Sequence, residues 1–282
     1  MRELRDSGVS WLGDVPEDWD VVPARAIFGE RKQRCGADDV HLTPSQKFGV
    51  LPQADYMQIT GSKVVLNVSG ADTMRHVEEG DFISHLRSFQ GGLEYARMGG
   101  KVSAAYTVLM PKVEIDPTYF KYLFKCDLYV QALQTTTDQL RDGQSIRFTQ
   151  FSSIPLPKPP LVEQQAIAEY LDWETAQLDA LIAILGIAPD PKRLSARYLD
   201  STLFALRPLL GWQSSIGTEI ASGGQPYVVG HSGASTMPPR TTHYSHVEDV
   251  ISRARRAADL ARERRAALIS AAVTGKIDVG AL

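Results

Sequence analysis

The chain has 282 residues, 43% hydrophobic and 22% charged, a composition typical of a soluble protein that forms a core. Its net charge of −3, with 17 Lys/Arg against 20 Asp/Glu in residues 1–155, argues against a free-standing basic nucleic-acid-binding protein. No apolar run predicts a membrane span or a signal peptide, and Cys35 and Cys126 are too few for a disulfide framework, so we expect a cytoplasmic protein without membrane association.

Residues 1–155 predict one α/β (α+β) domain. Short runs rich in β-branched and aromatic residues, separated by Gly, Asp and Asn, are interpreted as strands at 54–59, 63–68, 81–86 and 103–110. Asp116-Pro117 predicts a helix start, because Asp caps the free backbone N–H groups and proline lacks the N–H that would otherwise be unpaired.

Residues 156–185 predict a proline strap followed by a spacer helix. The prolines between 155 and 160 restrict their neighbours to extended geometry and stiffen the segment. The helix that follows is polar except for apolar residues at alternating steps of four and three, a heptad pattern typical of coiled coils. These residues, expected to pair with another helix, are Ile167, Leu171, Leu178, Leu181 and Leu185.

Residues 246–282 predict a second helix of the coiled-coil type, ending at a Gly275 cap. Its apolar seam is expected at Val247, Val250, Ala254, Ala257, Ala261, Leu268 and Ala271. The intervening residues 186–245 are dense in Gly, Pro, Ser and Thr, so they predict an irregular, exposed insertion.

Patterns of catalysis are weak. There is no phosphate-cradling GxxxxGK[ST] and no GxGxxG after a strand. His243 and His246 form a possible metal pair without further ligands, and Asp20 with Glu30 and Lys32 only loosely resembles a nuclease site. We therefore expect no catalytic residues, no metal and no cofactor.

Two polar loops instead predict contacts with DNA. Arg87, Ser88 and Gln90 stand beside Gly91-Gly92, and Arg can bond bidentately to guanine and Gln to adenine. The alternative is that Arg87 pairs with a carboxylate and the glycines only form a turn. The second loop carries Arg141, Gln144 and Arg147, for which a turn with a salt bridge is equally compatible. Phosphate contacts, or simple solvation, are expected for Lys63, Arg75 and Lys101.

Several segments of the chain resemble the specificity subunits of Type I restriction–modification systems. They are "WLGDVPEDWDVV", "VEEGDFISHLRSFQGGLE", "VSAAYTVLMP", "LRDGQSIRFTQFSSIPLPKPPLVEQQAIAEYLDWETAQLDALI" and "RERRAALISAAVTGKIDV". The resemblance implies a target recognition domain that binds double-stranded DNA, joined to helices that act as spacer and as docking surface for methylase subunits. It also implies that the methylase binds S-adenosylmethionine and methylates adenine N6, and that a restriction subunit cleaves.

The chain departs from this family pattern in carrying one recognition domain and an interrupted helical region. Two hypotheses stay open. The first is a half-length, non-catalytic specificity subunit that works with a second copy of itself or another specificity subunit on a bipartite site. The second is a degenerate structural protein that pairs through its helices and binds methylase without reading DNA. An independent enzyme is a distant third.

Overall fold

The computed structural model describes residues 2–61, 73–85, 88–136, 146–186 and 241–279. These residues divide into two compact units. The first comprises residues 1–176 together with 264–282, and the second comprises residues 177–263. The predicted elements at 63–68, the loop residues at 137–145 and most of the predicted insertion at 186–245 lie outside the described residues.

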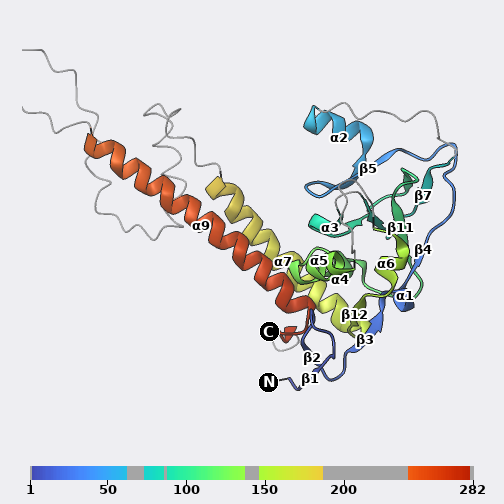
Figure 1. The fold of residues 1–282 in the computed structure, drawn as a ribbon. Coiled ribbons are helices and arrows are strands. Elements are labelled where there is room, and N and C mark those ends of the chain that lie inside the picture. Colours follow the sequence, from blue (N-terminus) through green and yellow to red (C-terminus); the bar gives the residue numbers. More distant parts are fainter. Residues whose placement is uncertain (1, 62–72, 86–87, 137–145, 187–240, 280–282) are drawn as a thin grey trace, which may run out of the picture. The chain divides into compact units, whose positions relative to one another are not determined.

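The first unit is built around a four-stranded antiparallel sheet in the order β4-β11-β8-β9 (Figure 1). Its core is mainly aromatic. Phe28 on the sheet meets Phe120, and Phe82 meets Phe124, in edge-to-face contacts with ring centroids 5.2 and 5.0 Å apart. The strands are β4 (Phe28–Glu30), β11 (Thr107–Pro111), β8 (Phe82–Ser84) and β9 (Glu94–Tyr95), and the helices behind them include α4 (Pro117–Leu123) and α5 (Asp127–Thr135).

Four two-stranded antiparallel ribbons and several short helices complete this unit. The ribbons are β1 (Leu4–Asp6) with β2 (Asp14–Pro16), β3 (Asp20–Pro23) with β12 (Pro155–Lys158), β5 (Leu42–Ser45) with β6 (Gly49–Pro52), and β7 (Arg75–Val77) with β10 (Gly100–Val102). The short helices are α1 (Ala24–Ile27), α2 (Gln53–Thr60), α3 (Ser88–Gly91) and α6 (Phe148–Ser152). The predicted mixed α/β class is confirmed.

One predicted strand is wrong: residues 54–59 lie in helix α2. Short apolar runs cannot be assigned to strand or helix by periodicity alone, and Gln, Ala and Met favour helix. The helix ends at Gly61, whose φ of 66° lets its N–H reach the carbonyl of Met57. The predicted strand at 81–86 contains β8, and the predicted strand at 103–110 overlaps β11 from Thr107 onward, so both strands are confirmed.

The predicted helix start at Asp116-Pro117 is confirmed, and it is tied to the later part of the chain. The Asp116 carboxylate accepts the N–H of Tyr119 at 2.8 Å, and the Asp116 N–H donates to the side chain of Gln164 at 2.9 Å. The proline strap is extended, as predicted, but it is not a free spacer. It forms β12, which pairs with β3, and Leu156 within it is fully buried.

Helix α7 (Leu161–Gly186) and helix α9 (Thr241–Val273) contribute to both units. In the first unit, Ile167 and Leu171 share the aromatic core with Ile269, Ala272 and Val273. In the second, Leu185 packs with Ala254 and Ala258, while Leu181 and Ala257 lie at the margin of that cluster and Leu178 is buried. The first predicted seam is thus on the buried side of α7 throughout.

The second predicted seam is only partly right. Ala254 and Ala261 are buried, but Val250, Ala257, Leu268 and Ala271 are half-buried, and Ile251, Ala258, Ile269 and Ala272 take the most buried positions. Ala258 and Ile269, like Ala261 and Ala272, are eleven residues apart. A heptad drifts by about 20° per repeat on a straight helix, so a seam extrapolated in sevens arrives one residue early. The Val247 side chain lies outside the described residues.

The ends of α9 also differ from expectation in one respect. The helix begins at Thr241 rather than 246, so the last five residues of the predicted insertion are helical, as is Gly186 at the end of α7. The predicted Gly275 cap is confirmed. Gly275 has φ 74°, its N–H donates to Ala272, and the N–H of Lys276 donates to Ala271, the pattern of a Schellman motif.

The N-terminal residues contact the start of α7 within the first unit. Trp19 is 1% exposed, packs against Tyr119, and donates its indole N–H to Glu163 at 2.9 Å. Arg2 forms ion pairs with Asp18 and Glu163. By packing, residues 1–176 and 264–282 form this unit. Among the described helices, none has the length and apolar character needed to cross a membrane.

Candidate nucleic-acid interface

The first predicted DNA-contacting loop connects β8 to β9 through the single turn of α3. Gln90 is exposed on α3, as a base-contacting residue would require. Ser88 is not, because it is fully buried and its hydroxyl accepts the N–H of His85 at 2.8 Å. The structure therefore corrects the expectation for Ser88, which supports the turn instead of pointing outward. Arg87 lies outside the described residues.

A buried charged group holds this turn from beneath. Glu94 is 1% exposed, ion-pairs with Lys125, and lies 3.3 Å from Nε2 of His85. Lys125 also donates to the carbonyl of Gly91 at 3.0 Å. A buried carboxylate is costly without such partners, so the cluster fixes the α3 turn to the connection between α4 and α5.

The two glycines of the loop lie in close contacts within the fold. Gly92 has φ 77°, and a Cβ on it would stand 1.8 Å from the carbonyl oxygen of Phe124. Only glycine fits there. A Cβ on Gly91 would stand 2.8 Å from the side chain of Gln46. At both positions a side chain would therefore require a neighbouring group to move.

The second predicted loop is attached to the same strand as the first. The hydroxyls of Ser84 on β8 and Thr107 on β11 both donate to the carbonyl of Ile146, at 3.1 and 3.0 Å. Arg147 follows as the exposed N-cap of α6, where its N–H donates to Gln150 at 2.9 Å. The sheet thus organises the segments that carry Gln90 and Arg147. Arg141 and Gln144 lie outside the described residues.

The predicted phosphate contacts fare differently. Arg75 donates to the carboxylate of Glu30 at 3.0 Å, and Lys101 is only 9% exposed within the β7–β10 ribbon. A cation that is already paired or buried binds a phosphate less strongly than an exposed one. Both side chains therefore contribute contacts within the fold. Lys63 lies outside the described residues.

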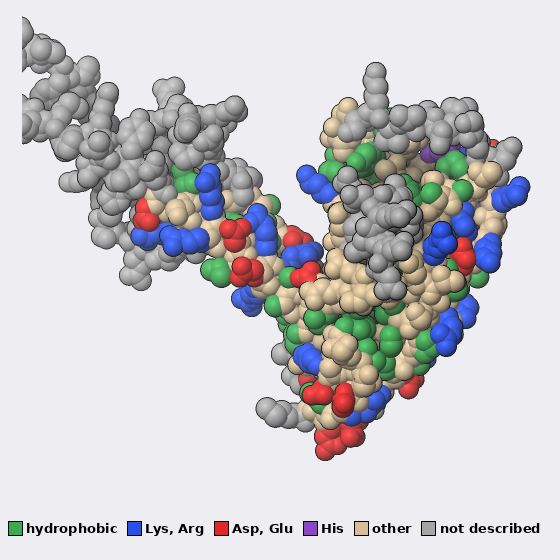
Figure 2. All heavy atoms as spheres, viewed as in Figure 1, with side chains coloured by type: hydrophobic (Ala, Val, Ile, Leu, Met, Phe, Trp, Pro, Cys, Tyr) green, Lys and Arg blue, Asp and Glu red, His purple; other side chains and the backbone are tan. Residues whose placement is uncertain are grey.

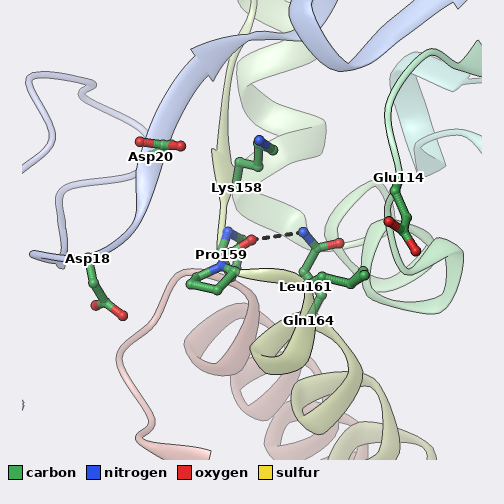
Figure 3. A pocket seen from close by; sticks show the side chains of 8 residues that line it. Asp18, Asp20, Glu114, Lys158, Pro159, Leu161 and Gln164 are labelled. Atoms are coloured by element: carbon green, nitrogen blue, oxygen red, sulfur yellow. Dashed lines mark hydrogen bonds between the residues drawn. The ribbon is translucent and has the colours of Figure 1, made fainter.

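A small hollow at the β3–β12 ribbon shows no sign of catalysis (Figure 3). It encloses about 190 Å³ and is lined by Asp18, Asp20, Glu114 and Lys158 together with the start of α7. Its buried amide, Gln164, already donates to the carbonyl of Pro159 at 2.8 Å. Asp20 faces this hollow without Glu30 or Lys32, so the loosely nuclease-like trio is not assembled here.

Nucleophile and metal chemistry find no support in the described part of the chain. Cys126 caps α5 through its sulfur, and burial raises the pKa of its thiol to about 11, which keeps it protonated. No cluster of three or more His, Cys, Asp or Glu suited to a metal occurs among the described residues. The His243 and His246 side chains lie outside them.

Sequence reasoning missed the residues that position the α3 turn. Glu94 and Lys125 are 31 residues apart, so no spacing links them, and Glu94 stands in an apolar setting between Leu93 and Tyr95. A lone carboxylate inside a strand-like run is the one feature that could have drawn attention to it, because such a group needs a buried partner.

Comparison with known proteins identifies the domain. Residues 50–185 match the Type I restriction modification DNA specificity domain. A comparison with curated proteins found no match. Among solved structures, the chain is similar to the HsdS subunit from Thermoanaerobacter tengcongensis, with 16% identity, a TM-score of 0.39, and coverage of 63% of this chain and 41% of that one.

A second similar structure is described as the structural basis underlying complex assembly and conformational transition of the type I R-M system. It is 11% identical, with a TM-score of 0.38, and the similarity covers 94% of this chain and 48% of that one. The chain spans less than half the length of either protein. The matched family segment runs from β6 to the end of α7 and contains both predicted DNA-contacting loops. Residues 50–185 therefore match the Type I restriction modification DNA specificity domain, the family that the sequence resembles.

Proposed function

We propose that this chain is the DNA sequence-recognition subunit of a Type I restriction–modification complex. It binds double-stranded DNA and directs a partner adenine-N6 methyltransferase, and a restriction subunit through the complex, to its site. The observation that carries this proposal is the match of residues 50–185 to the DNA specificity domain. That segment includes the exposed Gln90, which stands on a turn braced by Glu94 and Lys125.

The two long helices suit the remaining part of the task. A bipartite site needs recognition domains at a fixed separation, and a rigid helical element can act as a spacer. Leu185 with Ala254 and Ala258 joins α7 to α9, and small alanine side chains allow helices to approach closely. We assign methylase docking to these helices and DNA recognition to the domain before them.

The family match covers one such domain, at residues 50–185, and we propose that the chain works as a pair of half-subunits. If two identical copies pair symmetrically, each contacts the same half-site, and the two-fold symmetry of the protein is mirrored in the DNA. A second, different specificity chain would give an asymmetric site instead.

The test is adenine methylation in cells that express this chain with its methylase and no other specificity subunit. We expect N6-methyladenine at one interrupted palindrome, mapped by sequencing that detects the modified base. Methylase expressed alone is the control and should leave the genome unmodified. An asymmetric motif under these conditions would exclude the symmetric pair.

A degenerate structural protein is the competing function. The observations that favour it are the burial of Ser88 and Lys101, which removes two predicted DNA contacts from the surface, and the pairing of Arg75 with Glu30. A complex that assembles with methylase but leaves no sequence-specific methylation would support this alternative against DNA recognition.

Gln90→Ala separates base recognition from a structural role. If the Gln90 amide contacts a base, its removal should cost about 1–3 kcal/mol on the cognate site and relax discrimination at a single base position. The measurement is competition binding of the methylase complex against single-base variants of the site. Gln131→Ala, at an exposed position of α5, is the matched control and should leave discrimination unchanged. Equal weakening on every sequence would remove Gln90 from the recognition surface.

A further inference from the structure

Charge is unevenly distributed over the first unit. The segment from Ala24 to Arg34 holds four basic residues against one acidic residue, whereas the twenty residues before Val21 hold six acidic residues against two arginines. Figure 2 shows Lys and Arg side chains along the side of this unit formed by α1, β4 and β11, and Asp and Glu side chains at the end that holds β1 and β2. Such separation orients a protein toward a charged partner.

The basic side carries cations that the fold leaves available. Arg25, Arg34, Lys112 and Arg147 are exposed, and none has an ion pair among the described residues. Lys32 is 79% exposed, with its Nζ 3.9 Å from Glu30. By contrast, Arg31 is held by Asp81 at 2.7 Å and Glu78 at 2.9 Å. Arg31 is thus more buried and more closely paired than the exposed cations. The exposed cations are therefore not the ones that stabilise the sheet.

These cations come together because of the sheet topology. β4 is the edge strand of the four-stranded sheet and pairs with β11. Lys112 follows β11, donates its N–H to Ile27 at 2.8 Å, and lays its side chain over Gly29, where an added Cβ would stand 3.2 Å from the Lys112 Cδ. Helix α1, which carries Arg25, contacts α6, which begins after Arg147.

The end of the first unit that holds β1 and β2 is acidic, so the two ends of this unit differ in charge. Glu3, Asp6, Asp14, Glu17, Asp18 and Asp20 are all exposed. Arg2, one of the two arginines among them, is occupied by Asp18 and Glu163, and the other, Arg5, donates to the carbonyl of Trp19 at 2.6 Å. A polyanion would be repelled from this end and attracted to the basic side.

We propose that Arg25, Lys32, Arg34, Lys112 and Arg147, here called the basic edge, contact the phosphates of bound DNA. The inference rests on the proposed function and assigns the part of the domain that meets the duplex backbone. It replaces the paired Arg75 and the buried Lys101 as phosphate contacts. Arg147 then lies at the junction of the basic edge with the second predicted DNA-contacting loop. Charged side chains on an edge strand can also serve only to prevent edge-to-edge association of sheets, and the experiment separates the two roles.

The test is the salt dependence of DNA binding by the methylase complex carrying Lys32→Ala, Arg34→Ala and Lys112→Ala. Each lost phosphate contact should make the slope of log K against log salt shallower by about 0.9, so the triple variant should lose about 2–3 from the slope. Affinity should fall by the same factor on cognate and non-cognate DNA, because phosphates carry no sequence information.

The control variant removes the same charge elsewhere in the first unit: Lys47→Ala, Arg97→Ala and Lys276→Ala, at exposed positions outside the basic edge and outside both long helices. Size-exclusion chromatography and the melting temperature establish that each complex is assembled and folded. Three outcomes would each overturn the proposal that the basic edge contacts phosphates. They are an unchanged slope in the first variant, an equal change of slope in the control, and self-association of the first variant without loss of DNA affinity. Absence of sequence preference in the unmodified complex would instead overturn the proposed function.

Discussion

Gly92→Ala is expected to destabilise the first unit more than any other single methyl addition considered for it. The change adds about 1–2 kcal/mol for a left-handed backbone with a Cβ and about 1–3 kcal/mol for overpacking against the Phe124 carbonyl, a total of about 2–5 kcal/mol. The Cβ would stand 1.8 Å from that oxygen, so the turn or the helix end must move. The measurement is the free energy of unfolding in denaturant.

Gly49→Ala is the matched control for this change. Gly49 has φ 72°, close to the 77° of Gly92, but a Cβ on it would meet nothing within 4 Å. Its cost is therefore only the backbone contribution, about 1–2 kcal/mol. Equal losses in the two variants would show that the contact with Phe124 is not tight. A larger loss for Gly92→Ala should come with displacement of the turn that carries Gln90, and so with weaker sequence discrimination.

Leu185→Asp is expected to separate α7 from α9 in the second unit. Leu185 is 4% exposed and packs with Ala254 and Ala258, so the change removes a buried side chain and places a carboxylate in the apolar contact. Removal of a buried leucine alone costs about 2–5 kcal/mol, and an unpaired charge adds to it. Hydrogen exchange of the backbone amides of residues 249–263 should become much faster.

Ile184→Asp, one residue earlier, provides the comparison. Ile184 is 42% exposed, so the same chemical change at this position leaves the Leu185 contact in place and should barely alter exchange. If both variants exchange alike, the Leu185 contact does not hold the helices together. We also expect Leu185→Asp, and not Ile184→Asp, to weaken association with methylase, since the docking surface proposed above needs both helices in place.

Local chemistry made part of this fold predictable. The Asp116-Pro117 start and the Gly275 cap follow from hydrogen bonds that a helix end requires, and both are found. Residues 54–59 failed because six residues are too few to distinguish helix from strand, and the turn at Gly61 that ends α2 depends on φ, which glycine permits but does not impose.

The candidate site was less predictable, because exposure depends on contacts between distant segments. Gln90 and Ser88 are two residues apart and both polar, yet one is exposed and the other is fully buried. The buried pair of Glu94 and Lys125 requires the sheet to meet the α4–α5 connection, which no local pattern encodes. Nothing in the local sequence distinguishes Arg75 from Arg34. In the structure Arg75 forms an ion pair with Glu30, whereas Arg34 is exposed.

Residues from both long helices complete the core of the first unit, and this determines when that unit can fold during synthesis. Tyr119 donates its hydroxyl to the carbonyl of Val273 at 2.9 Å, and a Cβ on Gly275 would meet the Pro16 ring at 2.4 Å. These contacts join residues more than 150 positions apart, so a nascent chain that has emerged only as far as α7 still exposes the apolar surface that Ile269, Ala272 and Val273 later cover. The first unit, although most of it stands early in the sequence, can therefore complete its core only after the final turns of α9 have been synthesised.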